Sequence, residues 1–135
     1  MNPKKPRDFC KYCYTELERI DQIYCNTQCQ HDYAWKVRKL KLELDGKFPP
    51  SNKVARRYLI ERDGSKCLIC FRKEWDGKTM PLVLDHIDGN SDNWNISNFR
   101  MICPNCDTFT PFYKGRNKGN GRFKRKQRYK NGLSY

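Results

Sequence analysis

The chain has 135 residues, and its 28 Lys and Arg against 15 Asp and Glu give a net charge of +13. Leu, Ile, Val and Phe make up only about 19% of the residues, a content that together with high net charge is typical of disordered chains. A large apolar core is therefore excluded. A membrane span is excluded as well, because no apolar run approaches the necessary length of about 18 residues. Residues 1–9 contain no apolar stretch, so no secretory signal is expected.

Eight cysteines fall into two groups of four, and each group consists of two closely spaced pairs. The pairs are separated by 11 residues in the first group, Cys10, Cys13, Cys25 and Cys29, and by 32 in the second, Cys67, Cys70, Cys103 and Cys106. Two such pairs brought together across a loop present four thiolates in the tetrahedral arrangement of a structural Zn²⁺ site. Metal binding also supplies folding free energy to domains that lack a core. We therefore predict two structural zinc sites.

Three other uses of these cysteines were weighed. Four disulfides would suit a secreted protein, but the paired spacing and the lack of a secretory signal argue against them. A redox-active C-x-x-C pair is usually found singly in a βαβ fold. His31 follows Cys29 closely and could replace a thiolate, although the first quartet is complete without it. Zinc thiolate sites indicate a reducing compartment, the cytosol of a cell or of a host cell.

Helical patterns follow the first quartet. Residues 1–29 are predicted to form a small zinc knuckle. Residues 30–46 are predicted to be helical, because one apolar stripe recurs at helical spacing in Tyr33, Val37, Leu40 and Leu44. We expect this stripe to pack on a neighbouring module. Gly46 and the following prolines end the helix.

A second short helix is predicted after Ser51, a favourable N-cap residue, and it ends at Gly64. Residues 80–85 contain a short apolar run and are predicted to be a strand. Residues 88–98 are rich in Asp, Gly, Asn and Ser and are predicted to be a loop, and residues 98–102 a second strand. Pro104 suits the first turn of a closing helix, which would carry Cys106 and Asp107.

The C-terminal segment, residues 116–135, carries eight positive charges and no acidic residue. Phe123 and Tyr129 lie among these charges, and Gly119, Gly121 and Gly132 predict flexibility. A solvated basic tail is one interpretation. The other is an arm that becomes ordered on a polyanion, and the net charge of +13 favours nucleic acid as that polyanion.

One group of residues has the composition of a hydrolytic site. Asp85 and His86 lie between the halves of the second quartet, and Asp107 directly follows its last cysteine. A zinc ion in that quartet would draw Asp107 towards the strand that carries Asp85 and His86. Carboxylates favour Mg²⁺ or Mn²⁺, and a neutral histidine can take a proton from water. Together these groups suit hydrolysis of a phosphodiester.

The strand geometry sets a condition on this interpretation. Neighbours on a regular strand point to opposite faces, so Asp85 and His86 converge only where the strand ends or bulges. The alternative is structural, with His86 capping the strand and Asp85 accepting hydrogen bonds from the loop.

The second quartet and the residues around it resemble the HNH endonuclease family, whose fold is the ββα-metal fold. The matching stretch runs from Cys67 to about Gly119 and includes Asp85-His86-Ile87-Asp88-Gly89-Asn90 and Asn98-Phe99-Arg100-Met101-Ile102-Cys103-Pro104-Asn105-Cys106. The N-terminal knuckle and the basic run near residue 120 are similar to a bacteriophage subgroup. The resemblance implies a small, zinc-stabilised α+β fold with a ββα-metal core at residues 63–119. An N-terminal four-cysteine zinc knuckle (1–29) and a helical linker (30–62) would precede it, and a basic tail (120–135) would follow.

The resemblance also implies a role for each matching residue. His86 would be the general base, and Asp85 a ligand of the catalytic cation. Asn98 would orient the histidine or its loop. Asp107 stands where the family has a metal-ligating histidine, which shifts the expected preference towards Mg²⁺ or Mn²⁺ and away from Ni²⁺ or Zn²⁺. Asn117 would be a further contact to phosphate or metal.

The leading hypothesis is a metal-dependent endonuclease or nickase that acts on DNA, taken to be double-stranded, in the cytoplasm of a cell or of a phage-infected host. Its DNA contacts would be the basic residues Lys114, Arg116, Lys118, Arg122, Lys124, Arg125, Lys126 and Arg128. A zinc-held DNA-binding or packaging adaptor with an inactive HNH-like core is the alternative. A zinc ribbon that binds protein is a third interpretation.

Overall fold

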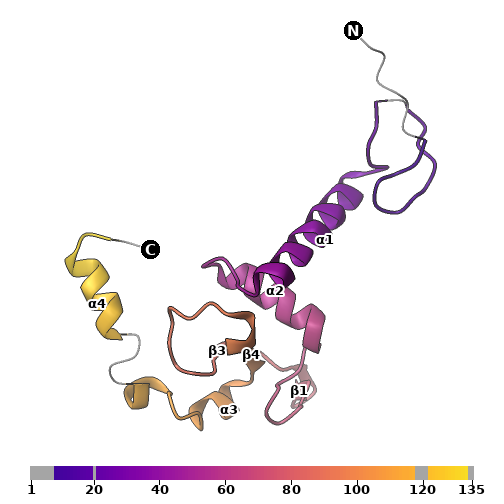
Figure 1. Ribbon diagram of the computed structural model, residues 1–135. Coiled ribbons are helices and arrows are strands. Elements are labelled where there is room, and N and C mark those ends of the chain that lie inside the picture. The colour runs from indigo at the N-terminus through magenta and orange to yellow at the C-terminus, as the bar shows by residue number, and fades with distance from the viewer. Residues whose placement is uncertain (1–7, 20, 118–121, 134–135) are drawn as a thin grey trace. The chain divides into compact units, whose positions relative to one another are not determined.

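A computed structural model describes residues 8–19, 21–117 and 122–133 (Figure 1), except for the side chains of residues 122–124. The chain divides into two compact units, Met1–Asp45 and Gly46–Tyr135. None of the helices in the described part of the chain is both long and apolar enough to cross a bilayer.

The first unit contains a short loop region and helix α1 (Thr27–Asp45). The predicted start of this helix at residue 30 is wrong, because the helix begins one turn earlier. Asn26 caps it, and its side-chain oxygen accepts a hydrogen bond from the backbone N–H of Cys29 at 2.8 Å. Cys29 therefore lies in the first helical turn, which the apolar spacing alone does not reveal.

The apolar stripe of this helix is not its buried face. Val37, Leu40 and Leu44 are 49%, 53% and 88% exposed, whereas Leu42, which is not part of the stripe, is 6% exposed. Tyr33, the remaining residue of the stripe, packs within this unit, with its ring centroid 5.7 Å from that of Tyr24. Packing of the stripe on a neighbouring module stays a prediction. A unit of this size with a four-cysteine cluster that could hold a metal ion needs no continuous apolar helix face.

The second unit begins with helix α2 (Asn52–Asp63). Ser51 occupies the N-cap position, but contrary to the predicted capping its side chain makes no cap hydrogen bond. Gly64 ends the helix with a φ of 82° and donates a hydrogen bond to the carbonyl of Ile60. The buried face consists of Val54, Ala55, Tyr58 and Leu59, and the helix packs against strand β4 (Phe99–Ile102).

A small hairpin, β1 (Glu74–Trp75) and β2 (Lys78–Thr79), follows the first half of the second quartet. The hairpin was not predicted from the sequence, because two-residue strands are too short to show alternation. The two turn residues Asp76 and Gly77 both have positive φ, 50° and 71°. This is the conformation that a tight two-residue hairpin turn requires, and Asp-Gly is a favoured pair for it.

Strand β3 (Val83–His86) pairs antiparallel with β4, with Asp85 opposite Arg100 and His86 opposite Phe99. A 3₁₀ turn, η1 (Ile96–Asn98), leads directly into β4. Helix α3 (Pro104–Thr108) follows β4 and packs against β3. The predicted order of strand, loop, strand and helix is confirmed, and the first strand lies one to three residues later than predicted.

The core of the second unit is small, as the composition predicts. Cys67, Met80, Ile102 and Cys103 form one buried cluster, next to Leu82 and Val83. A second cluster is aromatic, in which the ring of Phe48 lies 5.4 Å from the rings of both Tyr58 and Phe99. Both clusters include residues of β4, so the strand that precedes α3 is anchored on both faces.

The C-terminal segment is not uniformly flexible, which corrects the prediction from its glycines. It contains the 3₁₀ turn η2 (Lys114–Asn117) and helix α4 (Arg122–Lys130). Gly132 has a φ of 70° and ends α4 with a hydrogen bond to the carbonyl of Tyr129, while Leu133 bonds to that of Arg128. Gly119 and Gly121 lie outside the described residues.

Candidate functional site

The first cysteine quartet is assembled as the spacing predicts. The sulfur atoms of Cys10, Cys13, Cys25 and Cys29 all lie within 4.8 Å of one another. Cys25 Sγ lies 3.5 Å from Cys13 Sγ and 3.3 Å from Cys29 Sγ. His31 is exposed on α1 and is not part of this cluster.

The second quartet joins the loop after α2 to the start of α3, and its four sulfur atoms also lie within 4.8 Å of one another. The Sγ of Cys67 accepts hydrogen bonds from the backbone N–H groups of Ile69 and Cys70 at 3.4 and 3.5 Å. Cys103 is the N-cap of α3, and its sulfur accepts from the N–H of Cys106 at 3.5 Å. Backbone donors of this kind favour the thiolate form of a sulfur ligand.

The thiols of this cluster differ in acidity. Burial raises the pKa of Cys67, but backbone hydrogen bonds outweigh it and lower that pKa to about 6. Burial and the neighbouring cysteines raise the pKa of Cys106 to about 12. Four sulfurs this close cannot all ionise unless a cation offsets their charge. All eight cysteines are free thiols, so both quartets have the donor set of a structural Zn²⁺ site.

His86 is the last residue of β3 and lies in an aromatic environment. Its ring centroid is 4.5 Å from that of Phe99 and 6.0 Å from that of Trp94. The Nε2 atom is buried without a hydrogen-bond partner among the described residues. Burial lowers the pKa of His86, and the charges of Asp88, Asp85 and Asp92 oppose this shift only in part. The imidazole is therefore neutral near pH 7 and able to accept a proton.

Asp85 precedes His86 in the same regular ladder, so their side chains leave opposite faces of the strand. The Oδ2 atom of Asp85 accepts a hydrogen bond from Nε of Arg100 at 2.7 Å, and the Asp85 side chain is 12% exposed. The Asp85 carboxylate thus accepts a hydrogen bond from the facing strand β4. The structural alternative predicted that it would accept hydrogen bonds from the loop.

Asp107 lies in α3, and its backbone N–H donates to the carbonyl of Cys103 at 3.0 Å. Burial raises the pKa of the Asp107 carboxyl, the charge of Asp85 raises it further, and Lys114 opposes the rise. Asp85 and Asp107 are therefore within electrostatic reach of each other. Over the residues that the structure describes, only the two cysteine quartets bring three or more metal-binding side chains within 4.8 Å, so the acidic pair and His86 are gathered less tightly.

Asn98 supports the loop that follows His86. Its Nδ2 donates to Asp88 Oδ1 at 2.9 Å and to the carbonyl of Asn93 at 3.1 Å, and its Oδ1 accepts from the N–H of Asp88 at 3.0 Å. Burial alone would raise the pKa of Asp88, but hydrogen bonds from Asn93, Asn90 and Asn98 hold it below its ordinary value. Asn98 thereby fixes the loop rather than the imidazole ring.

Asn117, at the end of η2, contacts the same loop. Its Nδ2 donates to the carbonyl of Gly89 at 3.0 Å, while its Oδ1 is buried with no partner in the described structure. Gly89 has a φ of 70°, and a Cβ built on it would lie 2.4 Å from the ring of Phe112. The tight turn after His86 therefore needs glycine for two reasons, its backbone conformation and its lack of a side chain.

Substitution of Gly89 by alanine is expected to destabilise the second unit by about 2–4 kcal/mol, from the left-handed backbone and the clash with Phe112 together. Thermal unfolding followed by circular dichroism measures the effect. Gly77→Ala is the matched control, because it has a similar φ of 71° but no neighbour within 4 Å. Equal losses in the two variants would show that the close approach of Phe112 contributes nothing.

The predicted DNA-binding residues fall into three groups. The Nζ atom of Lys114 lies 5.0 Å from the ring centroid of Tyr113. The guanidinium of Arg116 donates a hydrogen bond to the carbonyl of Thr108 at the end of α3. Lys118 is outside the described residues, and for Arg122 and Lys124 only the backbone is described, in α4. The exposed side chains of α4 among the predicted set are Arg125, Lys126 and Arg128.

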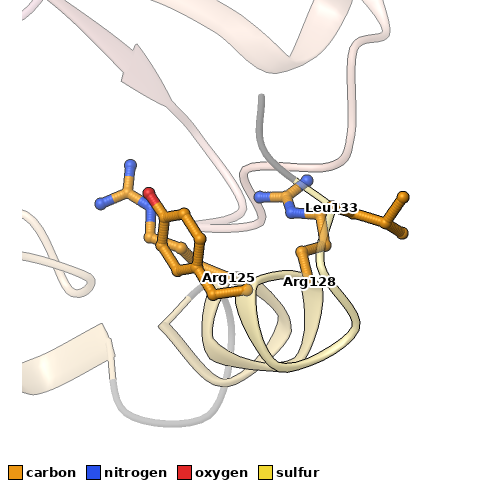
Figure 2. A pocket seen from close by; sticks show the side chains of 4 residues that line it. Arg125, Arg128 and Leu133 are labelled. Carbon is orange, nitrogen blue, oxygen red and sulfur yellow. The ribbon is translucent and has the colours of Figure 1, made fainter.

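Arg128 pairs with Asp92 in the loop after β3 through an N–O contact of 3.1 Å. Figure 2 shows Arg125, Arg128 and Leu133 around a small pocket at the end of α4. Its volume of about 10 Å³ is near the least that a single water molecule requires. The pocket is therefore too small to be a ligand site.

Two residues that contact this site were not singled out from the sequence. Asp88 was recognised only as part of a motif, although an Asx turn in a loop rich in Asp and Asn was a usable signal. Arg100 was likewise only part of a motif. Its pairing with Asp85 depends on the register of β3 and β4, which the sequence does not fix.

Comparison with known proteins gives one informative match. The chain is 43% identical over 104 residues to the H-N-H endonuclease F-TflIV of Escherichia phage T5, which covers 76% of this chain and 45% of that protein. The chain thus spans less than half the length of this curated relative. No protein-family profile matches the chain, and no solved structure matches it either. The identity over three quarters of the chain nevertheless confirms the resemblance that the motifs predict, a likeness to the H-N-H endonucleases of phage type.

Proposed function

We propose that this protein is a metal-dependent DNA endonuclease or nickase that hydrolyses phosphodiester bonds. The observation that carries the proposal is the packing of α3, which carries Asp107, against β3, which carries Asp85 and ends at His86. The relative named as an endonuclease supports the same conclusion. Residues 63–119 form the ββα-metal nuclease domain in this proposal, between a zinc knuckle with its helical linker and a basic tail.

His86 is the general base. Its Nε2 is buried between aromatic rings, so Nδ1 is the ring nitrogen assigned to the attacking water. The water oxygen forms a bond to phosphorus as its proton passes to His86, and the bond from phosphorus to the 3′ oxygen breaks. The products are a 5′ phosphate and a 3′ hydroxyl whose proton comes from solvent. Asn98 keeps the loop after His86 in place through its three hydrogen bonds.

Asp85 and Asp107 would hold the divalent cation. The fit rests on the packing of α3, which carries Asp107, against β3, which carries Asp85, since a cation between two such carboxylates relieves their repulsion. Two hard oxygen ligands suit Mg²⁺ or Mn²⁺. When bound, the cation supplies positive charge that stabilises the phosphate and the departing oxygen.

Incubation with supercoiled plasmid tests the proposal. The zinc-loaded protein is incubated with plasmid and Mg²⁺ or Mn²⁺, and nicked and linear products are separated on a gel. We expect nicked or linear DNA that depends on the added metal and disappears when excess chelator is present. A shifted plasmid band without cleavage would instead indicate a DNA-binding adaptor with an inactive core.

Exchange of Asp107 for histidine is expected to retain or raise nicking activity, because it restores the family's ligand and removes one of two repelling carboxylates. The metal preference is expected to shift from Mg²⁺ towards Ni²⁺, since imidazole is the softer ligand. Nicking rates in each metal measure both effects. Complete loss of cleavage in every metal would show that Asp107 has a different role.

DNA binding is expected to depend steeply on salt. If the basic residues of the C-terminal segment neutralise about six phosphates, affinity falls roughly a thousandfold between about 50 and 200 mM salt. Fluorescence anisotropy with a labelled duplex measures the slope in the absence of Mg²⁺ and Mn²⁺. A shallow slope would contradict the role assigned to these residues.

A further inference from the structure

We propose that Arg100 binds substrate directly, with a guanidinium that Asp85 holds in place and that receives a backbone phosphate of the DNA strand in a groove beside α3. This inference rests on the proposed nuclease function. It specifies where the DNA strand is bound, next to the carboxylates of Asp85 and Asp107. The sequence motif that contains Arg100 does not by itself assign this residue a role.

The ion pair fixes the guanidinium without using all of its donors. Asp85 and Arg100 face each other across β3 and β4, and the contact joins Nε to Oδ2 at 2.7 Å. An arginine carries five N–H donors in a rigid fork. The contact with Asp85 orients the fork through Nε, and the donors of the terminal NH₂ groups are the ones that the proposal assigns to phosphate. The Arg100 side chain is 26% exposed, compared with 12% for Asp85, so the arginine is the more accessible partner.

Arg100 lines a groove of about 240 Å³. Its walls come from the second quartet, from α3 and from the residues that follow: Ile69, Arg100, Cys106, Phe109, Thr110 and Pro111. Arg100 is the only charged residue among them. Phe109 and Ile69 are 84% and 41% exposed, so the groove combines apolar walls with one fixed cation.

This combination matches the chemistry of a nucleic-acid strand. Deoxyribose presents apolar faces, and each phosphate presents two oxygens that an arginine fork binds bidentately. The net charge of +13 attracts a polyanion. The groove also includes Cys106, the neighbour of Asp107, so a phosphate on Arg100 would lie beside the acidic pair. We assign the groove to the sugar-phosphate backbone of the strand that is cut.

Anisotropy with a short labelled duplex tests the assignment in zinc-loaded protein without Mg²⁺ or Mn²⁺. We expect Arg100→Gln to weaken binding about tenfold and to lower the slope of log affinity against log salt by about one. Asp85→Asn is expected to weaken binding less than Arg100→Gln does, because it retains the guanidinium and loses only the carboxylate that orients it. Arg62→Gln and Asp63→Asn are matched controls, since these residues form a 2.7 Å ion pair on α2 that is not part of the groove.

Three outcomes would overturn the assignment. Equal weakening by Arg100→Gln and Asp85→Asn would indicate a purely structural ion pair. Equal weakening by Arg100→Gln and Arg62→Gln would indicate general charge attraction. Unchanged affinity in Arg100→Gln would exclude the contact. If Arg100→Gln does not fold, the double variant Asp85→Asn/Arg100→Gln, which leaves no unpaired charge, is compared with Asp85→Asn alone, and the same tenfold loss is expected.

The two proposals fail separately. Binding that depends on Arg100 in a protein that never nicks plasmid would refute the nuclease function and leave the contact between Arg100 and a DNA phosphate standing. Efficient nicking together with unchanged affinity in Arg100→Gln would refute only the groove assignment.

Discussion

Replacement of His86 with alanine is expected to slow metal-dependent plasmid nicking by a factor of about 10²–10⁴, the usual contribution of a general base. The imidazole is held neutral by its burial next to Phe99 and Trp94, so its removal takes away the group that accepts the proton of water. Time courses of plasmid nicking at saturating Mn²⁺ measure the loss. DNA affinity should stay within about twofold, because a neutral ring contributes no charge to phosphate binding.

His31→Ala is the matched control, since His31 is the other histidine of the chain and is exposed on α1. It should nick at the wild-type rate. Full activity in the His86 variant would remove this residue from the mechanism. If both variants lost activity together with their folded structure, the assay would have to be repeated with His86→Gln, which retains a polar side chain of similar reach.

Loss of a single sulfur from the second quartet is expected to unfold the second unit. Cys67 is fully buried and Cys103 is 2% exposed, and both belong to the small buried cluster that also contains Met80 and Ile102. A structural zinc site contributes about 10–16 kcal/mol, which equals or exceeds the total stability of a typical domain. In Cys67→Ser, we therefore expect one bound zinc instead of two and no cooperative thermal transition for this unit.

Cys10→Ser provides the comparison, because Cys10 belongs to the quartet of the other unit. It should also reduce the zinc content from two to one, yet leave the transition of the second unit in place. Zinc content by atomic emission and amide spectra by NMR distinguish the two variants. A soluble Cys67→Ser protein with native amide spectra would exclude a metal clamp at this site.

The parts of the structure that local sequence determines were predictable. Cysteine pairs two or three residues apart identify both quartets, because short spacing places two sulfurs on the same side of a turn. Pro104 marks the start of α3, since proline suits the first turn of a helix. The strand that ends at His86 was found from its apolar run, although its limits differ from those predicted.

Predictions failed where a side chain depends on contacts between distant residues. Leu42 is buried on α1 while Leu40 and Leu44 are exposed, and the apolar spacing did not predict this, because spacing identifies residues on one helix face and not what covers that face. The basic tail contains helix α4, although its glycines predicted a flexible segment. The hairpin before β3 was too short for any periodic pattern to show.

The sequence alone determined which residues supply sulfur, carboxylate and imidazole groups, because donor chemistry is a property of each residue and of its near neighbours. The tertiary structure decided how these groups are arranged. The register of β3 and β4 sets Asp85 against Arg100, and the packing of α3 on β3 brings the charge of Asp107 within reach of Asp85. Phe99 and Trp94 enclose the His86 ring and lower its pKa by burial. Each of these effects depends on distances between residues that are far apart in the chain, and such distances exist only once the chain has folded.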